Sequence, residues 1–364
     1  MKKPTISIVA NFYNSRKFIP KLLYSIFNQT FRDWELICID DCSPTNDFEL
    51  ITSITSKEGY EQQVKVIRNK TNVGISKAKQ IGIENAQGLY ITFIDGDDWL
   101  ETKALEVMVT PALKYDIDYV IMNHYRRYPL GIKQPINNIT DEYFKPLFQP
   151  EIKDKYFISF FGINKINVAY WGKLIKTDIV RQSEFKHINY PIGEDLLFNM
   201  YIFPLLQSMM FVDYYGYNWR FGGITSSKHN ITKTKEIIEH FAEIYRIKRD
   251  FAIKHNYTKA VLPMLIELKN ILLNNISALC TTKKVKSDVI SLIDNIILSE
   301  KYSDITQLLS NPQYAEDPIV KGVCTKDAML IYSTCHKYYK RQWKRRFLKS
   351  LIRFFNYRIG FIAN

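Results

Sequence analysis

The chain has 364 residues, of which 46% are hydrophobic and 14% aromatic, with 24 Tyr and 22 Phe. This length and composition allow one large or two moderate globular domains and exclude a disordered chain. The formal net charge of +13 is concentrated at the C-terminus, because residues 331–364 contain nine Lys and Arg and no acidic residue.

The five cysteines lack the spacing of zinc ligands, so we expect free thiols in a reducing compartment. The first residues lack an apolar stretch long enough for a signal peptide. The longest apolar stretch, 196–212, is interrupted by polar residues and is too short to span a bilayer. We therefore expect a cytoplasmic protein.

The first hundred residues alternate between strand and helix patterns. β-branched and apolar runs predict strands at 5–10, 35–40, 64–67 and 90–94, and apolar residues at helical spacing predict helices at 16–27 and 75–86. This alternation is typical of βαβ units and a mainly parallel sheet. Polar and acidic residues accumulate where these strands end, which is where open α/β sheets bind ligands.

The pattern loosens between residues 119 and 165, where four prolines interrupt it, and we expect irregular structure lining an acceptor cleft. Order returns with a segment at 169–175, a helix at 196–203 and an aromatic strand at 211–220. From residue 232 onward the apolar spacing is helical. We therefore predict three regions, namely an α/β domain (1–230), a helical region (231–330) and a basic tail (331–364).

Three carboxylates and one glycine, Asp95-Gly96-Asp97-Asp98, follow the strand at 90–94. Carboxylates this close repel one another unless a cation or hydrogen-bond donors hold them together. Mg²⁺ and Mn²⁺ prefer oxygen ligands, and Mg²⁺ usually binds one or two carboxylates together with substrate phosphates. The cluster therefore indicates a divalent metal and a phosphate-bearing substrate, although an isolated match would fit a turn or a helix N-cap equally well.

Four segments, 7–14, 39–43, 72–79 and 95–98, together resemble the family 2 glycosyltransferases with the GT-A fold. The resemblance covers roughly residues 4–230. It implies a Rossmann-like α/β fold with a mixed, mainly parallel sheet flanked by helices. It also implies inverting transfer of a hexosyl or N-acetylhexosaminyl group from a nucleotide sugar.

The resemblance implies a donor site after the first two strands. Tyr13 would stack on the nucleotide base, and Asp41 would accept a hydrogen bond from a uracil-type N–H, which favours a UDP-sugar. Packing and helix capping are the alternative roles of these two residues. Asn11 stands where the family usually has proline, and Lys79 stands where arginine is common. Lys79 keeps the charge for a phosphate contact but lacks the bidentate fork, and a solvated helix face is its alternative.

The resemblance also implies a metal site for Mn²⁺ or Mg²⁺. Asp97 would coordinate the metal that bridges the diphosphate, and Asp95 beside Gly96 would contact the ribose or the metal shell. Arg220 begins a segment that resembles one that closes over the diphosphate in relatives. His229, in the same segment, is a candidate third ligand, with an ordinary surface position as its alternative.

The catalytic base is expected in the second half of the chain, since inversion requires a carboxylate opposite the leaving group. Glu194 and Asp195 resemble the Glu-Asp motif of the family, with Asp195 as the predicted base and Glu194 as the second choice. Both acids would also offset a helix macrodipole, which is the purely structural alternative. Trp171 and Lys173 lie in a segment that resembles the acceptor site, although a tryptophan there is equally typical of a core.

Residues 336–358 combine aromatic residues at three- and four-residue steps with Lys and Arg. This pattern predicts a basic amphipathic helix on an anionic membrane surface, with packing on the preceding helices as the alternative. Nucleic-acid binding has no support upstream. The expected setting is the inner face of a bacterial membrane, in lipopolysaccharide, capsule or lipid-linked glycan synthesis. A sugar nucleotidyltransferase and a non-catalytic glycan-binding or scaffold protein are the alternatives, and the first strand lacks the glycine-rich phosphate loop of the former.

Overall fold

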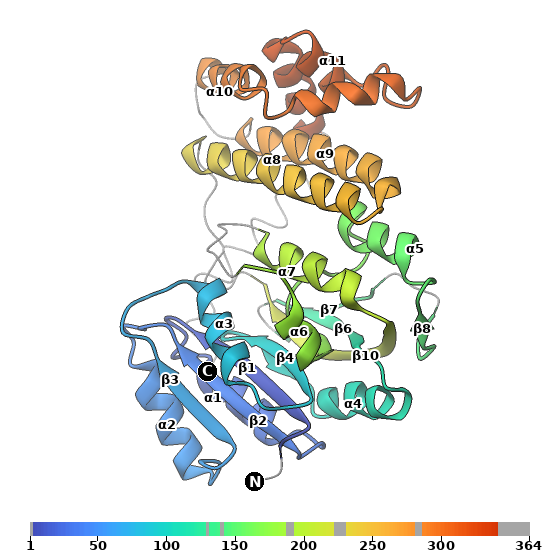
Figure 1. Ribbon diagram of the computed structural model, residues 1–364. Helices are drawn as coiled ribbons and strands as arrows, with labels where there is room; N and C mark the ends of the chain where they lie inside the picture. The colour runs from blue at the N-terminus through green and yellow to red at the C-terminus, as the bar shows by residue number, and fades with distance from the viewer. Residues whose placement is uncertain are drawn as a thin grey trace.

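The protein is described by a computed structural model that covers residues 3–128, 131–138, 142–186, 193–221, 231–280 and 286–340. A ten-stranded sheet with the order β3-β2-β1-β4-β9-β6-β10-β5 forms its centre, with β7 paired to β6 and β8 paired to β10 (Figure 1). The strands are β1 Ile6–Phe12, β2 Trp34–Asp40, β3 Val64–Arg68, β4 Tyr90–Asp95, β5 Trp99–Leu100, β6 Tyr119–Arg127, β7 Lys133–Ile136, β8 Leu147–Phe148, β9 Lys173–Lys176 and β10 Ser208–Arg220.

The strand directions bring the polar strand ends to one edge of the sheet. β1 is parallel to both β2 and β4, and β2 is parallel to β3. β9 is antiparallel to both β4 and β6, and β6 is parallel to β10, so β6 and β10 run in the direction of β4. The carboxyl ends of β1, β2, β4, β6 and β10 therefore meet at the same edge, where open α/β sheets bind ligands.

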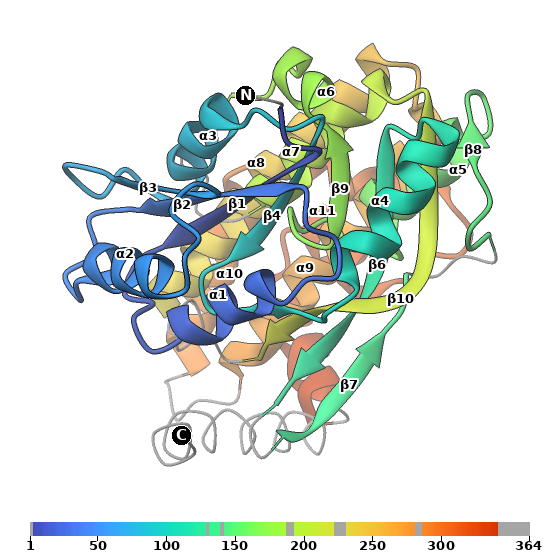
Figure 2. The same cartoon turned by 90° about the horizontal axis from the view of Figure 1, so that it is seen from below.

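Helices cover both faces of the sheet (Figures 1 and 2). On one face α1 and α4 bury their apolar stripes in one core, and on the other face α3, α6 and α7 join a second core. In α1 the apolar residues recur at three- and four-residue steps, which directs one stripe into the core. The helices before residue 203 are α1 Ile19–Phe27, α2 Asp47–Lys57, α3 Ile75–Asn85, α4 Ala104–Tyr115, α5 Lys153–Phe157, α6 Thr177–Gln182 and α7 Glu194–Ile202.

The C-terminal helices stack beyond α7, on the side of the sheet that carries α3 (Figure 1). They are α8 Ile231–Lys254, α9 Val261–Leu279, α10 Lys286–Leu298 and α11 Pro318–Cys324. The second core continues without interruption from the sheet through α7 into α8 and α9. No helix among the described residues is long and apolar enough to cross a membrane.

The α/β class with a mainly parallel sheet and a helical C-terminal region is confirmed. The expectation of irregular structure across 119–165 is wrong, because β6 is a nine-residue strand whose first six residues are buried. The prolines that obscured it lie outside this strand, for example Pro135 in the peripheral strand β7. The division into three regions stays a prediction. His229 and residues 341–364 of the predicted tail lie outside the described residues.

Candidate active site

The acidic turn after β4 is held to β10 by one buried carboxylate. Asp98 is 2% exposed, and its two oxygens accept hydrogen bonds from the Tyr217 hydroxyl and the Arg220 backbone N–H, both at 2.7 Å. The Tyr217 hydroxyl in turn accepts from the Asp95 N–H at 3.1 Å. Asp98 is therefore a bridge between the turn and β10, which leaves Asp95 and Asp97 as the half-buried carboxylates of the cluster.

Gly96 lets this turn approach β1. A Cβ atom at this position would lie 2.5 Å from the Asn11 carbonyl oxygen and 2.9 Å from the Ser15 hydroxyl, which is closer than real Cβ contacts come. The glycine therefore sets the spacing between the acidic turn and the loop after β1. Asn11 itself lies near the end of β1, and its side-chain amide donates to the Ile75 carbonyl at 3.5 Å.

Lys79 of α3 reaches the predicted catalytic acids of α7. Its amine lies 3.1 Å from Glu194 Oε1 and 3.7 Å from Asp195 Oδ1, and it stands 3.9 Å over the ring of Tyr170. Lys79 is 3% exposed. Burial lowers its pKa, but the charges of Asp195, Asp95 and Glu194 together outweigh that effect, so the pKa is raised on balance. The amine is thus a buried cation that pairs with Glu194 and Asp195 and is also stabilised by the charge of Asp95.

The same group of charges shifts the pKa values of Asp95 and Glu194. Burial raises the pKa of Asp95 to about 7, with Lys79 opposing the shift and the charges of Asp195, Asp97 and Glu194 adding to it. Burial also raises the pKa of Glu194, and Lys79 again opposes it. More negative than positive charge therefore gathers here, and a divalent cation would restore the balance.

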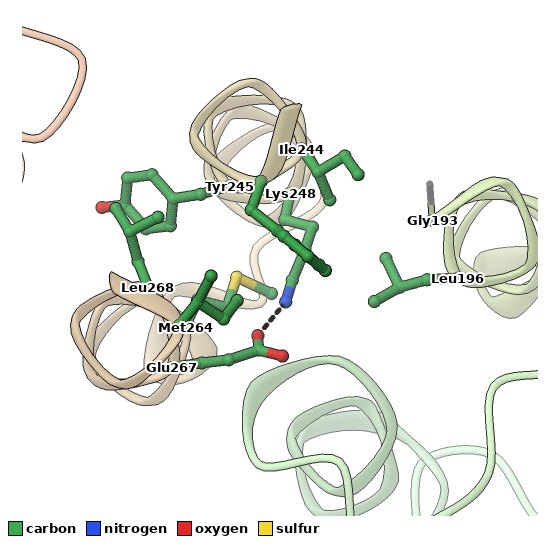
Figure 3. A pocket seen from close by; sticks show the side chains of 10 residues that line it. Gly193, Leu196, Ile244, Tyr245, Lys248, Met264, Glu267 and Leu268 are labelled. Atoms are coloured by element: carbon green, nitrogen blue, oxygen red, sulfur yellow. Dashed lines mark hydrogen bonds and ion pairs between the residues drawn. The ribbon is translucent and has the colours of Figure 1, made fainter. Parts of the chain in front are cut away.

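The first turn of α7 presents the two acids differently. Gly193 is the N-cap at φ +85°, and Glu194 and Asp195 follow it as the first helical residues. Glu194 is 6% exposed, whereas the Asp195 side chain is 37% exposed. Figure 3 shows Gly193 beside a small cavity of about 20 Å³ between α7, α8 and α9, with Ile244 of α8 facing it. Asp195 is therefore the accessible carboxylate, and Glu194 is the buried partner of Lys79.

The predicted nucleotide residues surround the ends of β1 and β2. Asp41 is buried and accepts hydrogen bonds from the Asn69 amide and from the Val73 and Gly74 backbone N–H groups, at 2.8 to 2.9 Å. Since a carboxylate has about four lone-pair sites, one remains on Oδ2 for a further donor. Tyr13 is 42% exposed, so its ring face is accessible to solvent.

Arg220, at the end of β10, lies beside the acidic turn. Its Nε donates to the Asp97 carbonyl at 2.9 Å, and its guanidinium carbon stands 4.4 Å from the Phe18 ring and 5.1 Å from the Trp99 ring. Burial lowers its pKa, which the charges of Asp97 and Asp98 oppose. The Arg220 guanidinium is therefore held beside Asp97.

The two predicted acceptor residues lie below the surface. Trp171 is 7% exposed and stacks on Tyr217 at 4.4 Å, which supports the Asp98 bridge. Lys173 is 1% exposed, and its amine donates to the Ala169 and Trp171 carbonyls. Burial lowers the Lys173 pKa to about 7, with the Asp195 charge opposing the shift. A contact of either side chain with an acceptor stays a prediction.

The donor set fits a divalent metal. Asp95 and Asp97 offer hard oxygen ligands, and one or two carboxylates with substrate phosphates are the usual Mg²⁺ environment. No group of three His, Cys, Asp or Glu that could hold a metal occurs within the part of the chain that the structure describes.

Sequence reasoning missed Tyr217 and Tyr170, which support Asp98 and Lys79. Tyr217 belongs to the predicted strand 211–220, and only the pairing of β10 with β5 and β6 brings it to the acidic turn. The structure gives Asp98 the role of joining the acidic turn to β10.

The mixed α/β sheet and the acidic turn at its ligand-binding edge define a GT-A type of protein. Residues 7–171 match the profile of glycosyl transferase family 2. The cholesterol galactosyltransferase of Borreliella burgdorferi is 26% identical over 335 residues, covering 89% of this chain and 92% of that protein. Residues 7–171 therefore contain a glycosyl transferase family 2 domain, and the curated relatives of the chain are glycosyltransferases.

Two solved structures share the fold. Staphylococcus aureus TarS 1-349 in complex with UDP-GlcNAc has a TM-score of 0.61 and 17% identity, with 92% of each chain covered. The mannosyltransferase PcManGT from Pyrobaculum calidifontis, in complex with GDP-Man and Mn²⁺, has a TM-score of 0.50 and 12% identity, with 98% of this chain and 88% of that chain covered.

Proposed function

We propose that this protein is a metal-dependent inverting glycosyltransferase that moves a sugar from a UDP-sugar to a hydroxyl of a saccharide or lipid-linked saccharide. The observation that carries the proposal is the Lys79 network, in which one buried cation pairs with Glu194 and Asp195 and its pKa is also raised by the charge of Asp95. Asp95 belongs to the donor side and Asp195 to the acceptor side of the reaction. The effect of Lys79 on both residues supports a single site for donor binding and for proton transfer.

On the donor side, Asp95 and Asp97 would hold Mn²⁺ or Mg²⁺, which when bound offsets the charge that develops on the departing diphosphate. Arg220 would add a fixed positive charge on the same side, because its Nε is already bonded to the Asp97 carbonyl. Asp41 would use its remaining lone pair for the N–H of a uracil, and Tyr13 would stack on the base. These contacts orient the sugar for attack.

On the acceptor side, Asp195 would take the proton of the attacking hydroxyl. Its side chain is more than a third exposed, whereas Glu194 is engaged by Lys79, which supports Asp195 over Glu194 as the base. We infer that Lys79 positions this pair, in place of the direct phosphate contact suggested by the sequence, because its amine is buried among carboxylates. The proposed base then lies in the first turn of α7.

The similarity to a cholesterol galactosyltransferase supports a hexosyl or N-acetylhexosaminyl donor and an acceptor at or near a lipid surface. We propose a role in bacterial surface glycan synthesis, with the enzyme peripheral on the inner membrane face. The basic sequence of 336–358 supports this location.

Two variants test the mechanism. Asp97→Ala should abolish the Mn²⁺-dependent rise in melting temperature that a UDP-sugar produces, since a ligand of the native state raises it. Asp195→Asn should keep that rise and lose transfer to acceptor by roughly 10²-fold or more, the usual contribution of general base catalysis. Asp288→Asn, at an exposed acid in the first turn of α10, is the matched control and should change neither. Full transfer activity in both site variants would refute the assignment.

A further inference from the structure

Three cations converge on one tryptophan at the carboxyl edge of the sheet. The Lys21 amine stands 3.6 Å over the Trp99 ring, and the guanidinium carbons of Arg220 and Arg127 lie 5.1 and 5.5 Å from the same ring. They come from three separate elements, α1, the end of β10 and the end of β6. Lys21 is exposed, and Trp99, Arg127 and Arg220 are half-buried, so the group faces solvent.

The positive charge of this cluster is only partly offset. Arg127 pairs with Glu101 at 2.8 Å, and Arg220 lies near Asp97 and Asp98, but among the described residues no carboxylate forms an ion pair with Lys21. Burial lowers the pKa of Lys21, and repulsion by Arg220 and Arg127 lowers it further, while Glu101 opposes them. Like charges held this close indicate a place where an anion binds.

The cluster is electrostatically distinct from the Lys79 network. The charges that act on Lys21 are those of Arg220, Arg127 and Glu101, whereas those that act on Lys79 are Asp195, Asp95 and Glu194. Lys21 is carried by α1 and Lys79 by α3, which cover opposite faces of the sheet. Asp97 and Asp98 lie beside the Lys21 cluster, since Arg220 bonds to both residues.

We propose that Lys21 and Arg127, next to the donor-side Arg220, form a binding site for a phosphate group carried by the acceptor. This inference rests on the proposed function. The diphosphate of the donor already has its counter-charge in the metal expected at Asp95 and Asp97, so Lys21 and Arg127 remain for a second anion. The half-exposed Trp99 offers an apolar face on which a sugar ring next to that phosphate can pack.

The test measures binding of glycerol 3-phosphate by ³¹P NMR, with the full-length protein saturated with UDP and Mg²⁺. Glycerol 3-phosphate should bind the saturated protein, and Lys21→Met should weaken this binding about tenfold, since a charge-assisted contact is lost. Lys21→Arg should keep it, and Lys57→Met, which removes one exposed charge at the end of α2, should have no effect.

Three results would overturn the inference. They are an absence of binding both with and without UDP, equal binding by the wild type and Lys21→Met, and binding that occurs only without UDP, which would assign the cluster to the donor diphosphate. UDP binding is measured separately by thermal shift. A protein that fails to bind UDP refutes the proposed donor function, whatever the phosphate result is.

Discussion

Gly193→Ala tests whether α8 fixes α7, the helix that carries the proposed catalytic acids. A Cβ atom at Gly193 would lie 2.4 Å from Ile244 Cδ1, and the residue has φ +85°, in the left-handed region (Figure 3). The left-handed alanine costs about 1–3 kcal/mol, and the overlap with Ile244 costs a further ~1–3 kcal/mol. We expect the free energy of unfolding, measured by urea titration, to fall by the sum of these terms. Transfer activity should fall as well, because α7 must move to relieve the overlap.

Two control variants separate the cost of the left-handed backbone from the cost of the overlap with Ile244. Gly59 has φ +75°, and a Cβ atom there would meet no other atom within 4 Å, so Gly59→Ala should lose only the backbone term and keep full activity. Ile244→Val removes the overlapping methyl group, so Gly193→Ala should cost less in that background, by about 1–3 kcal/mol. If Gly193→Ala costs the same in both backgrounds, within roughly 0.5 kcal/mol, the contact with Ile244 does not position α7.

The remaining predictions concern the buried polar groups. Asp98→Ala should lower the free energy of unfolding by about 1–3 kcal/mol or more, because the Tyr217 hydroxyl and the Arg220 N–H lose their acceptor, and urea unfolding measures it. Lys173 has a depressed pKa of about 7, so the unfolded chain binds more protons above pH 7 and stability rises with pH. The stability of the wild type should therefore rise relative to Lys173→Met between pH 7 and 9, and parallel curves would contradict the burial argument. Lys79→Met should lower kcat and shift the acid limb of its pH profile upward, whereas Lys79→Arg should leave that limb in place.

Much of the fold follows from local sequence patterns. The strand pattern predicts β4 within one residue, because Tyr90 to Ile94 form a β-branched and aromatic run that ends in acidic residues. β1 and β2 follow a similar rule, since parallel strands that are buried on both faces are mostly apolar. The same patterns miss β6, because prolines before and after residue 140 dominate the segment, although the first residues of β6 are buried and apolar.

The site is predictable only in part. The position of Asp95 and Asp97 at a strand end could be predicted, since it depends on local sequence. The pairing of Lys79 with Glu194, 115 residues apart, could not, because it requires α3 and α7 to pack on the same face of the sheet. The bond between Asp98 and Tyr217, 119 residues apart, depends in the same way on the position of β10.

The shared cation explains why these distant residues form one unit. Without Lys79, burial and mutual repulsion would raise the pKa values of Asp95 and Glu194 further, since its charge opposes both shifts. Both carboxyls would then stay protonated up to a higher pH, and a protonated carboxyl is a poor metal ligand. The donor-side and acceptor-side carboxylates thus depend on one side chain for their charge state. A substitution at position 79 should therefore impair metal-dependent donor binding and proton transfer together, whereas one at Asp97 or Asp195 should impair only its own step.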